Sequence, residues 1–517
     1  MFDVPQVLLP EIMRGHARVH PGKTALVCAD GALTWGAFDA ACRRVAASLS
    51  RRGIGRGDRV AVLAEPGLSS IVAQFGALAA GACVASLSGM ASGEALAGMI
   101  RDAAPRLLVV DARFRPMIEG IAAALPPELD GARVLIGPPE AGWEPFEAFA
   151  AGEDDAGLPL IERDDPFVVI YSSGTTGVPK GIVLSHGCRL ANAWMMAIEM
   201  RYDAEAVVFC GTALYSNTTW TLLTNAFLVG GTAVVMPRFD AVQALDLMER
   251  HRASHTVLVP AQVRAILEVA GSEARDLTAM RTLCTTGSAM PRALKERAIR
   301  RFPGAYTEIY GLTEGFALIL KPADAADHIE SVGKPMLGND VRIIDDAGRE
   351  LPPGEKGEIV GYGPLLMRGY HGRPDATAEA IWREPATGRT FLRSGDIGRF
   401  DEDGFLHLVD RKKDMLVSGG YNVYPADIER IAGRHPAVRE VAVIGVPHER
   451  WGETPLAFVA LRDGETVEAA PLTAWINERV GKHERVSACR LVEALPRNAG
   501  GKVLKRELRA DAEQAAA

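Results

Sequence analysis

Hydrophobic and polar positions follow a repeating pattern along most of this chain. Short runs rich in β-branched residues are separated by longer stretches in which apolar residues recur at helical spacing. The runs predict buried strands, and the stretches predict amphipathic helices. The predicted strands are 24–29, 59–64, 106–111, 167–173, 206–211, 232–237 and 255–260, and the predicted helices include 38–52, 68–80, 241–250 and 261–270. Strands that alternate with helices indicate an α/β fold, with mostly parallel sheets flanked by helices in a large N-terminal domain.

The pattern changes after residue 338. Short strands (VRIIDD, GEIVGY and GFLHLVDR) are separated by Gly, Pro and Asp turns, which predicts a small antiparallel β unit. The segment DRKKD (410–414) has no apolar residue. It precedes a compact stretch in which we expect helices at 425–433 and 472–480 and strands near 441–446 and 456–461. We therefore predict an N-terminal domain of residues 1–410 and a smaller α+β C-terminal domain of residues 414–517.

Composition and charge narrow the function classes. The 517 residues are 48% hydrophobic and 24% charged, which is typical of a globular protein and excludes a mainly disordered or fibrous one. The formal net charge is −8, so nucleic acid is not expected as the main partner. A local basic site for a small anion remains compatible with this balance.

Cysteine usage and the N-terminal sequence predict a cytoplasmic protein. The seven cysteines are odd in number and none are spaced C-x-x-C, which argues against a disulfide framework or a cysteine zinc site and fits a reducing cytoplasm. The first residues include Asp3 and Glu11 and lack a basic start with an apolar core, so no signal or transit peptide is expected. The most apolar window, 71–87, is rich in Ala and Gly and contains Gln74, which favours a buried helix over a transmembrane segment.

The stretch YSSGTTGVPKG (171–181) is the strongest chemical signal. It follows an apolar run and supplies three glycines that free the backbone to turn, four serine and threonine hydroxyls and one lysine, which together suit a phosphate chain. It is not a Walker A loop, because Pro179 and Gly181 flank Lys180 where that motif has Gly and Ser or Thr. A solvated Gly/Thr loop is the alternative interpretation.

This stretch resembles the signature loop of the adenylate-forming superfamily, which includes acyl-CoA synthetases, peptide-synthetase adenylation domains and firefly-type luciferases. The resemblance extends from about residue 20 to 510, and further motifs follow in the expected order. It implies that ATP is bound by Ser172, Ser173, Gly174, Thr175, Thr176, Gly177 and Lys180.

Two more motifs resemble the nucleotide site of that superfamily. TTGSAMP (285–291) implies that Gly287, Ser288 and Ala289 line the adenine pocket, although a plain strand-to-helix turn is the alternative. YGLTE (310–314) implies that Tyr310 and Gly311 contact adenine, Thr313 the α-phosphate, and Glu314 a Mg²⁺ ion. A single Glu suffices, because magnesium takes few carboxylate ligands beside phosphate oxygens.

The C-terminal motifs imply a moving domain. Asp396 and Arg411 resemble the residues that bind ribose and phosphate, and Lys413 falls at the hinge position within 411–413. Lys502, after two glycines, resembles the lysine that reaches into the adenylation site, where a flexible ammonium would neutralise developing charge. The smaller domain should therefore rotate at Lys413 between the two half-reactions.

The resemblance also implies where the thiol enters. SGGYNVYP (418–425) would place Gly419, Gly420 and Tyr421 along the pantetheine tunnel of CoA, and a β-turn before a helix is the alternative. Free coenzyme A is the expected acceptor because no carrier domain follows within the chain. A separate carrier protein remains an alternative.

The acid pocket departs from the family pattern. We expect Tyr215, Asn217 and Trp220 to line it, but Ser216 or Asn217 stands where a His is usual. Trp220 and its neighbours Leu222, Leu223 and Phe227 are apolar, which favours an apolar aliphatic (fatty) or aromatic acid, unless they are core residues of a helix.

The sequence thus predicts an ATP- and Mg²⁺-dependent carboxylic acid–CoA ligase that acts through an acyl-adenylate. The alternatives are an enzyme that loads a stand-alone carrier protein, a luciferase-like oxygenase, and a non-catalytic nucleotide-binding protein on the same scaffold. The oligomeric state is left open, with a homodimer among the candidates.

Overall fold

The computed structural model describes residues 7–152, 159–172, 179–418, 421–449, 451–497 and 503–514. The chain divides into two compact units. The first contains the residues up to 329 together with 335–340 and 362–392, and the second contains 330–334, 341–361 and the residues from 393 onward. The predicted segment 411–413 lies inside the second unit, and the domain boundary there stays a prediction.

The first unit contains two large sheets, each with a parallel centre and antiparallel strands at an edge. The first sheet is ordered β16 (Lys334–Pro335), β15 (Ala317–Leu320), β14 (Tyr306–Gly311), β13 (Thr282–Thr285), β12 (His255–Leu258), β10 (Val207–Cys210), β11 (Thr232–Val235), β1 (Thr24–Cys28), β2 (Gly31–Thr34). The second is ordered β19 (Gly369–Tyr370), β9 (Lys180–Ser185), β8 (Pro166–Ser172), β4 (Cys83–Ser86), β3 (Arg59–Leu63), β5 (Leu107–Asp111), β6 (Arg133–Ile136), β7 (Glu144–Pro145). The predicted α/β class and the seven predicted strands are confirmed.

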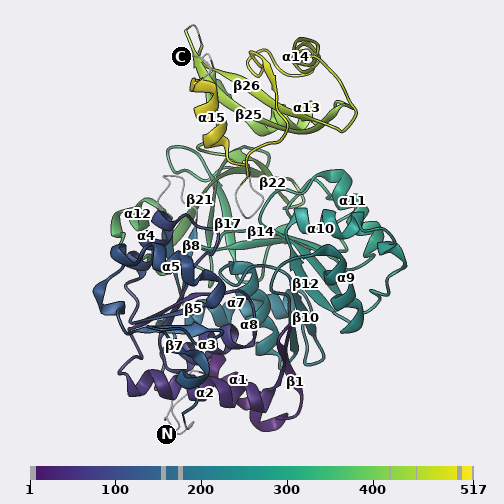
Figure 1. Cartoon of the computed structure of the whole chain (residues 1–517). Coiled ribbons are helices and arrows are strands. Elements are labelled where there is room, and N and C mark those ends of the chain that lie inside the picture. Colours follow the sequence, from purple (N-terminus) through teal and green to yellow (C-terminus); the bar gives the residue numbers. More distant parts are fainter. Residues whose placement is uncertain are drawn as a thin grey trace. The chain divides into compact units, whose positions relative to one another are not determined.

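Helices cover both faces of these sheets (Figure 1). Between the sheets, one apolar core joins residues of both to the helices α1 (Leu9–Val19), α2 (Trp35–Arg51), α3 (Leu68–Ala79), α7 (His186–Glu199) and α8 (Asn217–Leu228). The outer helices are α4 (Gly93–Ala103), α5 (Arg115–Gly120), α9 (Ala241–Arg250), α10 (Pro260–Glu268) and α11 (Arg292–Arg301). Short helices α6 (Phe146–Phe149) and α12 (Pro374–Glu379) lie in the connections.

Local sequence accounts for where two of these helices begin. Helix α2 starts three residues earlier than predicted, because the Thr34 side chain accepts a hydrogen bond from the Ala37 backbone N–H and caps the first turn. Helix α3 contains the start of the apolar window that was assigned to a buried helix, and its residues from 70 onward are buried. None of the helices within the described residues is both long and apolar enough to cross a bilayer. All seven cysteines are free and buried, which confirms that no disulfide framework is present.

Two smaller sheets complete the fold. In one, β17 (Asp340–Ile344), β18 (Gly357–Tyr362) and β21 (Thr390–Phe400) are neighbours, β20 (Ile381–Arg383) pairs with the start of β21, and β22 (Leu406–Arg411) pairs antiparallel with the rest of it. The other is ordered β24 (Tyr421–Val423), β23 (Leu416–Ser418), β26 (Gly452–Leu461), β25 (Val438–His448), with β27 (Cys489–Leu491) beside β26. The antiparallel texture predicted after residue 338 is confirmed.

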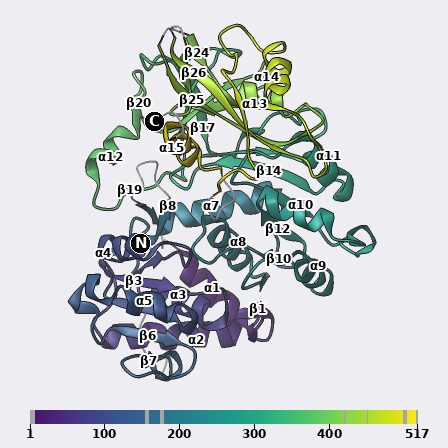
Figure 2. The ribbon, with the colours of Figure 1, turned by 45° about the horizontal axis from the view of Figure 1, so that its top comes forward.

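Alternation along β25 explains why helices cover both faces of the last sheet. Val443 packs in one apolar cluster with residues of α13 (Pro425–Ala432) and α14 (Ala469–Asn477). The next residue, Ile444, packs in another cluster with residues of α15 (Lys505–Gln514). Successive strand residues face opposite sides, so a strand that is apolar at both positions must be covered twice. Figure 2 shows the same elements from another side.

One buried histidine in the first unit makes stability depend on pH. The ring of His255 is stacked on Tyr202 with centroids 3.9 Å apart, Nδ1 lies 2.8 Å from Ser254 Oγ, and Nε2 lies 3.1 Å from Met200 O. Burial lowers the pKa of His255 to about 4, from an ordinary value of 6.5. The folded imidazole therefore stays neutral at a pH where the unfolded chain already takes up a proton.

We expect His255 to lower the free energy of unfolding as the pH falls from about 6.5 to about 4, by up to about 3 kcal/mol in total. His255→Gln removes the titrating group, so its unfolding free energy should fall less steeply over this interval. Urea unfolding of both proteins at several pH values between 7 and 4 measures the two slopes. Equal slopes would show that His255 does not contribute.

Candidate active site

The predicted phosphate loop connects two paired strands. Strands β8 and β9 are antiparallel, and the pair nearest the loop is formed by the backbones of Ser172 and Lys180. Lys180 is the first residue of β9 and is half-buried. The predicted phosphate-binding residues Ser173, Gly174, Thr175, Thr176 and Gly177 lie outside the described residues, as does the side chain of Ser172. The strands thus fix the two ends of the loop.

Three side chains come together beside this hairpin. Tyr370 lies on β19, which pairs with β9, and the Lys180 Nζ is 4.9 Å from the centroid of the Tyr370 ring. The Tyr370 hydroxyl donates a hydrogen bond to Glu314 Oε1 at 3.2 Å. Burial, and then the neighbouring Glu314 charge, raise the pKa of Tyr370, so this phenol is protonated at neutral pH. A cation, a hydroxyl donor and a carboxylate therefore form one cluster.

The predicted adenine and α-phosphate motifs follow neighbouring parallel strands. TTGSAMP begins at the end of β13, and YGLTE spans the end of β14 and the turn after it. Because β13 and β14 are parallel, both turns leave the same edge of the sheet. The Thr286 hydroxyl also donates to Ile309 O at 3.0 Å, which ties the first turn to β14. Ligands of open α/β sheets bind at the carboxyl ends of strands, where these motifs lie.

Two predicted glycines have backbone reasons to be glycine. Gly287 has φ +93°, which side chains with a Cβ rarely adopt, and Ser288 and Ala289 follow it in an exposed turn. A Cβ on Gly311 would lie 2.9 Å from the Phe316 backbone oxygen, because β14 turns directly into β15 there. The shape of the turns therefore requires glycine at both positions, whether or not a ligand binds there.

Tyr310 and Thr313 lie on either side of Gly311. The Tyr310 ring is 6.5 Å from Phe316 in an edge-on arrangement, and Thr313 is half-buried in the turn that leads to Glu314. The Glu314 backbone oxygen accepts from the Met367 N–H at 2.8 Å. The turn is thereby held to the segment that carries Tyr370.

The predicted acid-pocket residues occupy two different environments. Tyr215 and Asn217 are half-buried around the start of α8, whose N-cap is Ser216. Trp220 is only 1% exposed, its Nε1 donates to Ser86 Oγ at 3.0 Å, and its ring lies between Phe75 and Phe167. Its neighbours Leu222, Leu223 and Phe227 are equally buried in the core. The apolar side chains of α8 therefore pack inside the fold.

The two predicted ribose contacts are direct partners in the second unit. Asp396 on β21 and Arg411 on β22 face each other across the antiparallel pair, and Arg411 Nε is 3.0 Å from Asp396 Oδ1. Asp396 is buried, while the Arg411 side chain is 39% exposed. The carboxylate is thus held in place by a cation that has access to solvent.

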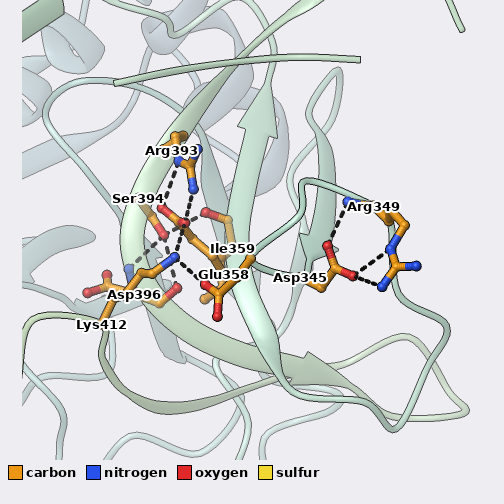
Figure 3. A network of polar contacts seen from close by, with 9 residues as sticks. Asp345, Arg349, Glu358, Ile359, Arg393, Ser394, Asp396 and Lys412 are labelled. Carbon is orange, nitrogen blue, oxygen red and sulfur yellow. Dashed lines mark hydrogen bonds and ion pairs between the residues drawn. The ribbon is translucent and has the colours of Figure 1, made fainter. Parts of the chain in front are cut away.

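A buried carboxylate that the sequence did not reveal lies next to this pair. Figure 3 shows Glu358 of β18 with Arg393 and Lys412. Arg393 donates from Nε and Nη2 to the two oxygens of Glu358, at 3.2 and 2.5 Å, and Lys412 Nζ is 3.2 Å away. Burial would raise the pKa of Glu358, but the hydrogen bonds and charges of Arg393 and Lys412 outweigh it, and the pKa lies below its ordinary value.

Lys412 is part of this network and is therefore not simply a solvated charge in a linker. Its Nζ also contacts Asp346 at 2.8 Å, and the next acidic residue, Asp414, accepts from Arg509 Nη2 of α15 at 2.9 Å. Lys413, the predicted hinge, is exposed between these two anchored residues. Its role as a hinge stays a prediction.

The remaining predicted residues cannot be placed. Gly419, Gly420 and Lys502 lie outside the described residues, and so does the side chain of Tyr421, which begins β24. Among the residues that are described, no cluster of three or more His, Cys, Asp or Glu side chains could hold a metal ion. Glu314 alone fits a Mg²⁺ ion that arrives with ATP, because such an ion takes most of its ligands from phosphate and water.

The chain belongs to the AMP-binding enzyme family. The family model described as AMP-binding enzyme matches residues 13–371, and the one described as AMP-binding enzyme C-terminal domain matches residues 427–502. Membership of this family and the acid–thiol ligases among its relatives show that the protein is an AMP-forming acid–thiol ligase.

Three similar proteins show the breadth of that class. A fatty acid–[acyl-carrier-protein] ligase, ScoC of Streptomyces coeruleorubidus, is 32% identical over 96% of this chain and 94% of its own length. A feruloyl-CoA synthase of Amycolatopsis sp is 34% identical over 95% of this chain and 96% of its own. The crystal structure of ATP-bound MatB from Rhodopseudomonas palustris has a TM-score of 0.88 and 28% identity, covering 98% of this chain and 100% of that one.

Sequence reasoning missed Tyr370 and Glu358, and local sequence held little signal for either. Tyr370 lies in a two-residue strand, and Glu358 lies in a strand of which all residues but the last are buried. Their partners are distant in the chain, so only the pairing of β19 with β9 and the neighbouring positions of β18 and β21 bring them into place.

Proposed function

We propose that this protein is an ATP-dependent carboxylic acid–CoA ligase that acts through an acyl-adenylate and releases pyrophosphate and AMP. The observation that carries the proposal is the cluster of Lys180, Tyr370 and Glu314 at the end of the signature hairpin. A lysine suits the departing phosphates, and a carboxylate held by a phenol suits the Mg²⁺ that accompanies ATP.

In the first half-reaction, a carboxylate oxygen of the acid attacks the α-phosphorus of ATP, and the bond to pyrophosphate breaks. The substrate is the nucleophile, so the protein contributes position and charge. Lys180 with Thr175 and Thr176 would hold the leaving pyrophosphate, and Thr313 and Lys502 would stabilise the α-phosphate. Gly287, Ser288, Ala289, Tyr310 and Gly311 would hold adenine, and Asp396 and Arg411 the ribose.

In the second half-reaction, the thiol sulfur of CoA attacks the acyl carbonyl and AMP leaves. Gly419, Gly420 and Tyr421 would line the path of the pantetheine arm, because glycine leaves room for a thin chain. Rotation at Lys413 would remove Lys502 from the site before the thiol enters. The acid would be an aliphatic or aromatic one.

The decisive experiment is pyrophosphate release from ATP with a panel of carboxylic acids, followed by thioester formation with CoA. We expect acid-dependent pyrophosphate release and AMP formation that requires CoA for turnover. Absence of acid-dependent exchange between ATP and pyrophosphate with every acid would refute the adenylation step.

A carrier-protein acceptor is the second candidate, because the ScoC relative is named for that acceptor. Measuring AMP release with CoA alone, and then with a stand-alone acyl carrier protein alone, separates the two. Turnover with the carrier protein but not with CoA would replace the first proposal with the second.

A further inference from the structure

A buried arginine next to the predicted acid pocket has free hydrogen-bond donors. Arg189 lies on α7 and is 2% exposed, and its Nη1 donates to Asn217 Oδ1 at 2.8 Å. Its Nε and Nη2 are inaccessible to solvent and have no hydrogen-bond partner among the described residues. Buried charged groups are normally paired, so two unpaired donors on a buried guanidinium indicate a partner that the described part of the chain does not supply.

No carboxylate of the described chain forms an ion pair with Arg189. Burial lowers its pKa to about 10, so it remains a cation at neutral pH. Lys295 differs in this respect: it is also a buried cation, but its Nζ lies 2.7 Å from the buried carboxylate of Glu308. Within the described residues, one buried charge is therefore compensated by a carboxylate and the other is not.

The two free nitrogens have a definite shape. Nε and Nη2 form one side of the planar guanidinium and present two parallel N–H groups, which match the two oxygens of a carboxylate. The same pair of nitrogens on Arg393 binds both oxygens of Glu358 (Figure 3). A carboxylate is therefore the group whose two oxygens match the two unpaired donors of Arg189.

The surroundings favour an anion as well. Asn217, which Arg189 contacts, is the first residue of α8, and the N-terminal end of a helix carries partial positive charge. His186 and Asn192 lie one turn away on each side of Arg189 along α7. Both are buried, and the two ring nitrogens of His186 have no hydrogen-bond partner among the described residues, so this ring can offer one N–H to an anion. Tyr215 and Asn217, at the start of α8, are half-buried.

We propose that Arg189 binds a second carboxylate of the acid substrate, at a distance from the carboxylate that is adenylated. The substrate class is therefore a dicarboxylic acid rather than a simple fatty or aromatic acid. This inference rests on the proposed function, since it names the acid of that reaction. Trp220 and its apolar neighbours pack in the core, so the acid is selected by the half-buried polar residues and Arg189.

A dicarboxylate would be preferred for a physical reason. A monocarboxylic acid that fills the same space leaves the guanidinium buried and without a partner, and sites built around a hydrogen bond reject analogues that lack it. We expect the native enzyme to use the diacid at least ~10-fold better in kcat/KM than the matched monoacid.

The test compares acids that differ only in the second carboxylate. The pairs are hexanoate with hexanedioate, octanoate with octanedioate, and 3-phenylpropanoate with 3-(2-carboxyphenyl)propanoate, assayed by ATP–pyrophosphate exchange with the full-length chain. In Arg189→Met we expect kcat/KM to fall ~100-fold for the preferred diacid and to change by less than about 3-fold for its monoacid. Arg189→Lys keeps the charge without the planar fork, and should recover only part of the loss.

Stability measurements separate ligand binding from a structural role. Arg189→Met removes an uncompensated charge and should not lower the melting temperature of the ligand-free protein. The control Lys295→Met leaves Glu308 buried and alone, and should lower it by about 5 °C. A comparable loss in Arg189→Met, or an equal loss of activity toward every acid, would overturn the proposal.

Binding can also be measured without turnover. With a non-hydrolysable ATP analogue present, the preferred diacid should raise the melting temperature of the native protein but not of Arg189→Met. If no acid supports exchange, the proposed function fails, while this shift still decides the role of Arg189. If monoacids and diacids are used equally by the native enzyme and by Arg189→Met, the proposal fails and the ligase function stands.

Discussion

Replacing Lys502 with alanine should lower acid-dependent ATP–pyrophosphate exchange by at least ~100-fold, which is the scale on which one preorganised charge-stabilising donor acts. The lysine would approach the α-phosphate only during adenylation, so the loss should appear in kcat of that half-reaction. Thioester formation from a synthetic acyl-adenylate and CoA should fall less than about 10-fold, because AMP is then the leaving group and the proposed rotation would have moved Lys502 away from the site.

Lys505 provides the matched control for this prediction. It lies three residues further on, at the start of α15, and its Nζ pairs with Glu429 at 2.7 Å. Lys505→Ala removes the same charge from the same region and should leave exchange within a few-fold of the native value. If Lys502→Ala left exchange unchanged, or lowered both half-reactions equally, the proposed role of this lysine would be wrong.

Glu314→Gln should lower exchange by about 100-fold and raise the Mg²⁺ concentration needed for half-maximal rate. The amide keeps the size of the side chain and still accepts a hydrogen bond from the Tyr370 hydroxyl, so the substitution removes little besides the negative charge. The Mg²⁺ dependence distinguishes a lost metal contact from a local disturbance of the turn.

Two further variants complete that test. Tyr370→Phe removes only the hydroxyl that donates to Glu314. It should lower the rate of ATP–pyrophosphate exchange about 5-fold without a large change in the Mg²⁺ requirement. Glu402→Gln, in an exposed turn, removes a carboxylate of no predicted role and should have no effect. An unchanged Mg²⁺ requirement in Glu314→Gln would contradict the assignment of this carboxylate to the metal.

Most of the secondary structure could be predicted from the sequence because strands and helices leave different apolar periods. The run at 255–260 became β12, and the stretch at 241–250 became α9 with the predicted bounds. The hairpin β25–β26 is longer than predicted, since pairing continues from Val438 to His448 through residues that carry no apolar signal. Backbone hydrogen bonds extend strands beyond the apolar residues that define them.

The candidate site was predictable only where its chemistry is local. The phosphate hairpin, YGLTE and the Asp396 and Arg411 positions each lie in short segments, and the structure pairs the last two directly. Arg189 was not singled out from the sequence, because a single arginine in the stretch that forms α7 gives no local signal of its surroundings. Its meaning depends on the absence of a carboxylate partner among the described residues, which no local pattern reveals.

The sequence by itself determined the layered α/β architecture, the family and the order of the nucleotide motifs, because these depend on apolar period and on contiguous side chains. Only the tertiary structure decided which distant residues meet: Tyr370 with Glu314 and Lys180, Glu358 with Arg393 and Lys412, and Arg189 with Asn217. The physical reason is that strand pairing and helix packing set these contacts across long separations in the chain. The energy of a buried charge depends on the neighbours that such packing supplies.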